Sequence, residues 1–192
     1  MPGDNPDEIF DLVDLQDQVI GQVRRKQAHQ DPTLVHRSIQ VMVFDASGKR
    51  VLLQRRSRVK DLFPGYFCAS ASGHVASGEN YAETALRETE EELGCVLTLA
   101  YVGKEVVRSV YETEMTALFL GCSDGPFFFH PIETDGGEFL ALADVERYLA
   151  EESLDMTPAL QAALRAIFRL CEDGVLDALL AELRPDGEQE KL

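Results

Sequence analysis

Short apolar runs separated by turn residues dominate the first two thirds of the chain, a pattern typical of β-strands. Two such runs on either side of residues 15–18 predict an N-terminal β-hairpin within residues 11–23. Residues 39–44 and 51–54, joined by a turn that contains Gly48, predict a second hairpin. Further strands are expected at residues 66–71, 96–110, 111–121 and 137–142.

One helix is marked at both of its ends. Ser77 is a residue type that caps helix N-termini, and Gly94 stands where a left-handed C-terminal cap falls. Residues at spacing i, i+3, i+4, i+7 and i+11 predict its core-facing side: Ala82, Ala85, Leu86, Thr89 and Leu93. Residues 142–152 and 158–183 are also helical in pattern, and the second segment is interrupted near Gly174.

Strands before and after one strongly marked helix predict a mixed α/β or α+β class in which helices cover a sheet. With 192 residues, of which 45% are hydrophobic, the chain is long enough for one well-packed core. We therefore expect a lead at residues 1–10, a single domain at residues 11–183 and a disordered tail at residues 184–192.

Charge narrows the choice of partners. The chain carries 34 acidic and 18 basic residues, a net charge of −16, so a nucleic acid polymer would be repelled. Six of the basic residues lie within residues 49–60, where the local sign is reversed. The four cysteines are far apart, and no apolar run approaches the roughly 18 residues of a membrane span, so we expect a cytoplasmic protein with reduced thiols and no membrane partner.

Three carboxylates converge on the predicted helix. Glu88, Glu91 and Glu92 fall within about 100° of one another, because i, i+3 and i+4 positions are neighbours on one face. Like charges at this spacing repel, so the arrangement is a net cost unless cations lie among them. Carboxylate oxygens suit Mg²⁺ or Mn²⁺, which can bind substrate phosphates at the same time. Taken alone, however, a glutamate-rich helix in an acidic protein is more often a solvated face.

A longer pattern spans residues 73–95. It reads Gly73, five residues, Glu79, seven residues, Arg87-Glu88, two residues, Glu91-Glu92, one residue and Gly94. In this the chain resembles the Nudix hydrolases, whose box has the same seven letters, although Thr89 and Cys95 stand where aliphatic residues are preferred. A chance match is on the order of one in a million. The resemblance implies a Nudix fold, an α/β/α sandwich with a mixed β-sheet.

The same resemblance implies roles for the box residues. The implied catalytic set is Arg87, Glu88, Glu91 and Glu92. The three glutamates would bind Mg²⁺ or Mn²⁺, Gly73 would bring backbone close to the metals, and Glu79 would pair with Arg87 to orient the helix. The implied enzyme is a pyrophosphohydrolase acting on a small diphosphate-containing metabolite, either a nucleoside di- or triphosphate or a nucleoside diphosphate linked to another group. Bound metals would neutralise phosphate oxygens and activate a water molecule.

Outside the box, residues 11–119 resemble the isopentenyl-diphosphate isomerase branch of the superfamily and the hydrolases closest to it. The matching pieces are LVDLQDQVIGQ, HRSIQVMVF, VLLQRRS, KDLFPG and SGH. The isomerase binds a metal with three histidines and two glutamates, and the matching residues, a second candidate metal site, are His29, His36, His74, Glu112 and Glu114.

One residue separates the two activities. The isomerase needs a cysteine where this chain has Ser72, and serine is far less acidic than a thiol. Cys68, four residues upstream, is a poor replacement. The resemblance therefore favours a hydrolase, with an isomerase or a non-catalytic metabolite-binding Nudix domain as alternatives.

Substrate contacts are less clearly marked. Arg55, Arg56 and Lys60 are candidates for binding a distal phosphate, although strand alternation lets only one of the two arginines face the site. The candidate general bases are Glu91, Glu92, Glu112, Glu114, Glu133 and Glu138. Residues 127–129, three consecutive phenylalanines, are more often core or interface anchors than a base-stacking surface. The C-terminal helices are expected to pack against the domain or against a second copy of the chain in a homodimer.

Overall fold

The computed structural model describes residues 5–184. The predicted N-terminal hairpin is present as β1 (Ile9–Val13) and β2 (Val19–Arg24), and β1 begins two residues before the expected domain boundary. A one-turn helix, α1 (Arg25–Ala28), follows it. Most of the expected tail lies outside the described residues.

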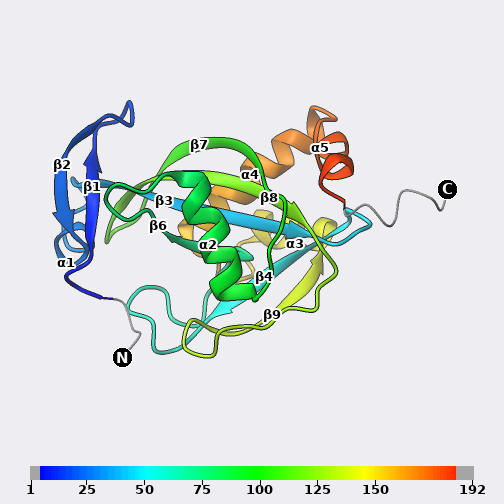
Figure 1. Cartoon of the computed structure of the whole chain (residues 1–192). Helices are drawn as coiled ribbons and strands as arrows, with labels where there is room; N and C mark the ends of the chain where they lie inside the picture. Colours follow the sequence, from blue (N-terminus) through cyan, green and yellow to red (C-terminus); the bar gives the residue numbers. More distant parts are fainter. Residues whose placement is uncertain (1–4, 185–192) are drawn as a thin grey trace.

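The strand β3 (Val35–Phe44) is the centre of a mixed nine-stranded sheet (Figure 1). It pairs antiparallel with β1, β4 and β6, and parallel with β8 over ten residues. The remaining strands are β4 (Arg50–Arg56), β5 (Phe67–Cys68), β6 (Ala71–His74), β7 (Ala100–Arg108), β8 (Thr113–Cys122) and β9 (Thr134–Ala141).

Helices cover both faces of the sheet, so the expected α/β/α sandwich is confirmed. Ile39, Val41 and Val43 of β3 pack in one core beneath α2 (Tyr81–Leu93). Met42 and Phe44, which alternate with them, pack in a second core on the opposite face. The helices over this second core are α3 (Leu142–Glu151), α4 (Pro158–Glu172) and α5 (Leu176–Leu183). Among the described residues, no helix is long and apolar enough to cross a membrane.

The helix α2 begins four residues later than Ser77, so the predicted N-terminal cap is wrong. Asn80 caps α2, since its side chain accepts two backbone N–H groups of the first turn at 3.0 Å each. Ser77 lies in the preceding turn, and its hydroxyl donates to Asp11 Oδ1 at 2.6 Å instead. The predicted left-handed cap at Gly94 is present, with φ 66°.

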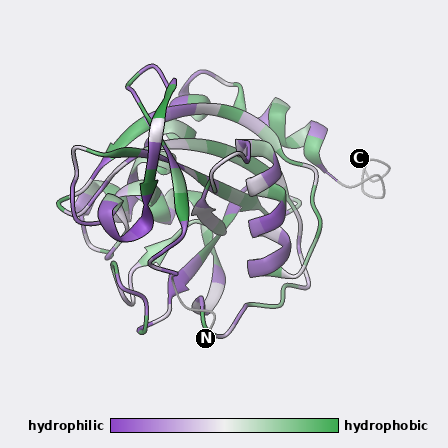
Figure 2. Ribbon diagram, turned by 60° about the vertical axis from the view of Figure 1, so that its left-hand side comes forward, coloured by the Kyte–Doolittle hydropathy of each residue, from purple (hydrophilic) through white to green (hydrophobic). Residues whose placement is uncertain are grey.

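The face of α2 that is buried differs from the apolar face that the spacing predicted, by a rotation about the helix axis. Leu86 is 46% exposed and Ala82 is exposed, whereas Thr84 and Glu92 are buried. Figure 2 shows that α2 is mainly hydrophilic although it lies directly on the sheet. The rotation brings carboxylates, rather than two of the apolar side chains, toward the interior.

An ionic network fixes the turn of the N-terminal hairpin to the sheet. The carboxylate of Asp17 accepts hydrogen bonds from Arg37 at 2.6 Å, from the Tyr81 hydroxyl at 3.1 Å and from Lys104. Burial by itself raises the pKa of Asp17, but the hydrogen bonds from Lys104 and Arg37 outweigh it and leave the pKa below its ordinary value. One side chain thus joins the hairpin to β3, β7 and α2.

Replacing Asp17 with asparagine tests this network. Asparagine tolerates the left-handed backbone at this position, φ 64°, but carries no charge. We expect Asp17→Asn to lower the free energy of unfolding by about 1–3 kcal/mol at pH 7, as measured by denaturant titration. A carboxylate with a lowered pKa stabilises the fold above its unfolded pKa, near 4, and loses this effect as the pH falls through its folded pKa. The difference from wild type should therefore shrink below about pH 4, and an equal difference at pH 3 and pH 7 would contradict the assignment.

Candidate active site

A cavity of about 740 Å³ opens where α2, the central strands and the start of α4 meet. It brings together segments far apart in the sequence, from Glu8 near the N-terminus to Ala159 at the start of α4. Its acidic lining residues are Glu8, Asp61, Glu88, Glu91, Glu92, Glu112, Glu114 and Glu133. The box glutamates and the second candidate metal site therefore share one cavity.

The three box glutamates line one side of this cavity with different degrees of burial. The side chain of Glu88 is 14% exposed and that of Glu91 is 61% exposed, whereas Glu92 is buried. Burial raises the pKa of Glu88 to about 7 and that of Glu92 to about 8, where the nearby charge of Glu88 adds to the effect. Divalent cations among these carboxylates would offset both burial and repulsion, so the set fits Mg²⁺ or Mn²⁺.

Arg87 connects the box residues to one another. Its guanidinium group lies 3.1 Å from Glu79 Oε2, 2.7 Å from Glu88 Oε1 and 3.4 Å from Glu91 Oε2. Glu79 also accepts a hydrogen bond from the Thr84 hydroxyl at 3.0 Å. Burial by itself raises the pKa of Glu79, but the hydrogen bonds from Arg87 and Thr84 together with the charge of Arg87 outweigh it and leave the pKa below its ordinary value. The loop before α2 is thereby attached to the face that carries the glutamates.

Gly73 is the place where β6 touches α2. A Cβ atom on this glycine would lie 2.3 Å from both Cδ and Oε1 of Glu88, closer than any real contact. Only a residue without a side chain lets the β6 backbone lie against this carboxylate. The structure thus places Gly73 beside a proposed metal ligand.

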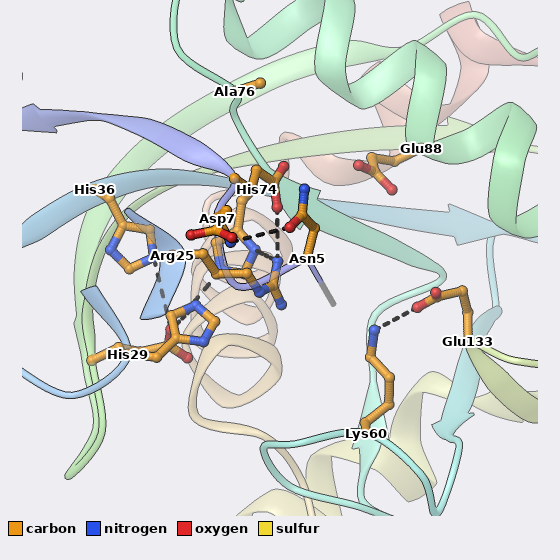
Figure 3. A network of polar contacts seen from close by, with 12 residues as sticks. Asn5, Asp7, Arg25, His29, His36, Lys60, His74, Ala76, Glu88 and Glu133 are labelled. Carbon is orange, nitrogen blue, oxygen red and sulfur yellow. Dashed lines mark hydrogen bonds and ion pairs between the residues drawn. The ribbon is translucent and has the colours of Figure 1, made fainter. Parts of the chain in front are cut away.

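The residues of the second candidate site converge at the other end of the cavity. The Nε2 atoms of His29, His36 and His74 lie 3.1, 3.7 and 3.9 Å from Glu112 Oε2. Candidate ligand atoms of these four residues all lie within 4.8 Å of one another, and Glu114 Oε1 lies 3.5 Å from His74 Nε2. Figure 3 shows His29 and His36 pointing toward a common point.

Two of these residues have the properties expected of metal ligands. His36 is fully buried, and neither its ring nitrogens nor Glu112 Oε2 make a hydrogen bond among the described residues. Burial, with the neighbouring His74, lowers the pKa of His36 to about 3, so its ring is neutral and can bind a metal. A bound cation would satisfy the buried ring nitrogens of His36 and would also neutralise Glu112, whose Oε2 lies near three imidazoles.

His74 is held differently. Arg25 Nη1 lies 3.1 Å from His74 Nδ1, and a guanidinium group can only donate, so Nδ1 is the acceptor. A neutral ring then carries its proton on Nε2, which faces Glu112 and Glu114. In this arrangement His74 donates toward the glutamates, and a metal at Nε2 would have to displace that proton.

The predicted basic residues separate as strand alternation requires. Arg56 and Lys60 line the cavity, and Lys60 Nζ lies 2.5 Å from Glu133 Oε2 (Figure 3). Arg55, expected to bind substrate, lies outside this cavity, because its side chain leaves the opposite face of β4. Its guanidinium group packs 4.3 Å from the centroid of the Phe67 ring and donates to the Gly65 carbonyl at 3.1 Å.

The structure also places the remaining candidate bases, the three consecutive phenylalanines and Cys68. Glu138 is the one candidate base that does not line the cavity. Phe127 and Phe129 pack against the core beneath α2, whereas Phe128 is 72% exposed. Cys68 is buried, and burial raises the pKa of its thiol to about 12, so it cannot supply the thiolate that Ser72 lacks.

Several cavity residues were not identified from the sequence. Arg25 is one that could have been, since it stands four residues before His29 in a basic segment. Others come from segments without readable chemistry, among them Asn5, Ser38, Gln40, His130 and Thr157. Only the fold brings these residues to the site.

The fold and the site define a protein of the Nudix class, and comparisons with known proteins agree. A family model described as the NUDIX domain matches residues 34–167, and the chain belongs to this family. An uncharacterized Nudix hydrolase of Yersinia pestis is 43% identical over 129 residues, 67% of this chain and 70% of that protein. An isopentenyl-diphosphate Δ-isomerase of Nocardia farcinica is 33% identical over 160 residues, 80% of this chain and 91% of that protein.

A solved structure supports the same assignment of the fold. A crystal structure from Deinococcus radiodurans is similar with a TM-score of 0.70 and 27% identity, over 82% of this chain and 98% of that one. Hydrolases and isomerases thus both appear among the relatives. The family supports a pyrophosphohydrolase-type enzyme.

Substituting Gly73 tests the contact between β6 and α2. In Gly73→Ala the new methyl group must push the Glu88 carboxylate aside, and because a side chain can rotate, we expect a cost of about 1 kcal/mol, at the low end for overpacking. Denaturant titration measures the cost, and a crystal structure should show a displaced Glu88. Gly103→Ala on β7 is the control, because its added Cβ meets nothing within 4 Å. Equal stability of both variants and an unmoved Glu88 would contradict the close approach.

Proposed function

We propose that the protein is a metal-dependent Nudix hydrolase that cleaves a diphosphate linkage in a small nucleotide-type substrate. The main supporting observation is that the buried carboxylates of Glu88 and Glu92 line one wall of a cavity and have raised pKa values. Arg87 offsets the effect of burial only in part at Glu88, and Lys60 and Arg56 offset it only in part at Glu92. Divalent cations bound to these carboxylates would offset the cost of burying them. A polar solvated helix would not bury these groups.

Each group around the cavity has a role in this proposal. Glu88, Glu91 and Glu92 hold Mg²⁺ or Mn²⁺ beside the Gly73 backbone, and Arg87 with Glu79 keeps the helix oriented. When bound, the metals supply charge neutralisation at the phosphate oxygens and a water of lowered pKa. Arg56 and Lys60 bind phosphate oxygens. Glu133, which faces the cavity beside Lys60, joins Glu91, Glu92, Glu112 and Glu114 as a candidate to accept the proton of the attacking water.

The substrate class follows from the cavity and from the family. A volume of about 740 Å³ accommodates a nucleotide-sized molecule, within the usual range for small-molecule sites. The Nudix domain of Shewanella oneidensis NrtR, similar in fold with a TM-score of 0.58 and 16% identity, was crystallised with ADP ribose. We propose a nucleoside di- or triphosphate, or a nucleoside diphosphate linked to another group.

We also propose that His29, His36, His74, Glu112 and Glu114 hold a second type of metal ion. The three imidazoles suit Zn²⁺, and the two carboxylates also suit Mn²⁺. For His74 to join, Arg25 has to release Nδ1 or the Nε2 proton has to leave. The convergence of these residues favours isopentenyl-diphosphate isomerase as a second candidate function. Ser72 in place of a thiol argues against it, and complete absence of proton exchange into isopentenyl diphosphate would remove it.

The box assignment predicts the behaviour of Glu92→Gln. This variant keeps the shape of Glu92 but loses the charge that binds metal, and a loss of about 3 kcal/mol of transition-state stabilisation corresponds to roughly a hundredfold lower kcat/KM. A phosphate-release screen of nucleotides, nucleotide sugars and coenzymes with Mg²⁺ and Mn²⁺ first identifies the best substrate. Glu90→Gln is the matched control, because Glu90 lies exposed on the same helix outside the cavity. Unchanged turnover in Glu92→Gln would show that the box is not the active site.

The second metal site predicts an unusual stability pattern for His36→Phe. The substitution removes two buried nitrogens without hydrogen bonds and stacks a phenyl ring near Phe10, whose ring centroid lies 5.1 Å from that of His36. We expect the metal-free variant to be at least as stable as metal-free wild type, because unsatisfied buried groups cost about 1–3 kcal/mol. The increase in melting temperature on adding Mn²⁺ or Zn²⁺ should be smaller in the variant. An equal increase in both proteins would remove His36 from the metal site.

A further inference from the structure

Gln54 lies beneath the box glutamates at the point where the core ends and the cavity begins. It is on β4 between Leu52, which packs in the core under α2, and Arg56, which lines the cavity. Its backbone is paired on both sides, with Cys68 of β5 and Gly137 of β9. Only 1% of its surface is exposed. Gln54 is therefore buried on a strand that is paired on both sides.

The side-chain amide of Gln54 contacts a proposed metal ligand. Nε2 donates to Glu92 Oε2 at 2.9 Å, and it also donates to the Ser70 carbonyl. Both partners accept hydrogen bonds, so both amide hydrogens are used and the orientation of the amide is determined. Glu92 also lines the cavity, so its carboxylate is accessible to a cation there.

The chemical nature of this contact suits a metal site. A cation in place of Gln54 would neutralise Glu92 and compete with the metal, whereas an apolar residue would leave a buried oxygen without a partner. A neutral amide orients the carboxylate and leaves its negative charge available. Residues that orient metal ligands in this way typically change metal affinity or activity by about 10–100-fold when they are mutated.

We propose that Gln54 is a positioning residue of the metal site, which holds Oε2 of Glu92 and so directs Oε1 to the cation. This inference rests on the proposed function, because it requires Glu92 to bind metal. It assigns a role to a residue outside the box.

The test is binding of Mn²⁺ alone, measured by titration calorimetry without substrate, on proteins that all carry His36→Phe, which removes a ligand of the second proposed metal site. We expect Gln54→Leu to weaken Mn²⁺ binding by about 10–100-fold. Gln161→Leu is the control, because Gln161 Nε2 also donates to a backbone carbonyl, that of Met156 at 3.2 Å, but outside the cavity. If Gln54→Leu does not fold, Gln54→Asn serves instead, since it stays polar but is too short to reach both acceptors.

A double-mutant cycle with Glu92→Gln separates a positioning role from a general structural one. If Gln54 acts through Glu92, Gln54→Leu should weaken Mn²⁺ binding in the background that keeps Glu92 and have little further effect in Glu92→Gln. Equal weakening in both backgrounds, or unchanged affinity in Gln54→Leu and Gln54→Asn while Glu92→Gln binds weakly, would overturn the role of Gln54 alone. Unchanged affinity in Glu92→Gln would overturn the proposed metal site as well, because Gln54 would then have no metal ligand to position.

Discussion

The site depends on one close approach, that of the β6 backbone at Gly73 to the carboxylate of Glu88. β6 is fixed to the central strand, where Gly73 pairs with Ile39, and α2 lies directly over it. Because Gly73 has no side chain, the Glu88 carboxylate can lie against the β6 backbone and away from bulk water. The raised pKa of Glu88 follows from this burial, which disfavours the charged carboxylate.

The same strand connects the two candidate metal sites. Gly73 touches Glu88, and the next residue, His74, faces Glu112 and Glu114. Ser72, just before them, also lines the cavity. Three consecutive residues of β6 thus reach both ends of one cavity. A small shift of this strand would change both sites together, which is a physical reason for its firm pairing with β3.

Much of this arrangement could be predicted from the sequence. The spacing from Gly73 to Gly94 indicated the box, and the strand patterns indicated both hairpins and a sheet covered by helices. The mixed α/β/α architecture came from the resemblance. The resemblance indicated that the three histidines and the Glu-x-Glu pair form one site. In the fold, candidate ligand atoms of the histidines and of Glu112 lie within 4.8 Å of one another, and Glu114 is not part of this group. The local pattern predicted the wrong N-terminal cap for α2, which is Asn80 and not Ser77. The chain makes a turn between β6 and α2, and the length of that turn depends on where the strand and the helix lie in the fold.

The sequence by itself determined the periodic features, because helical and strand spacing are properties of neighbouring residues. It thereby placed Glu88, Glu91 and Glu92 on one helix face and put Arg55 and Arg56 on opposite sides of a strand. Only the tertiary structure decided which of the two arginines reaches the cavity, that Arg25 contacts His74, and that Gln54 contacts Glu92. These contacts join residues 38 or more positions apart, and they exist only because the sheet and α2 pack in one particular rotation.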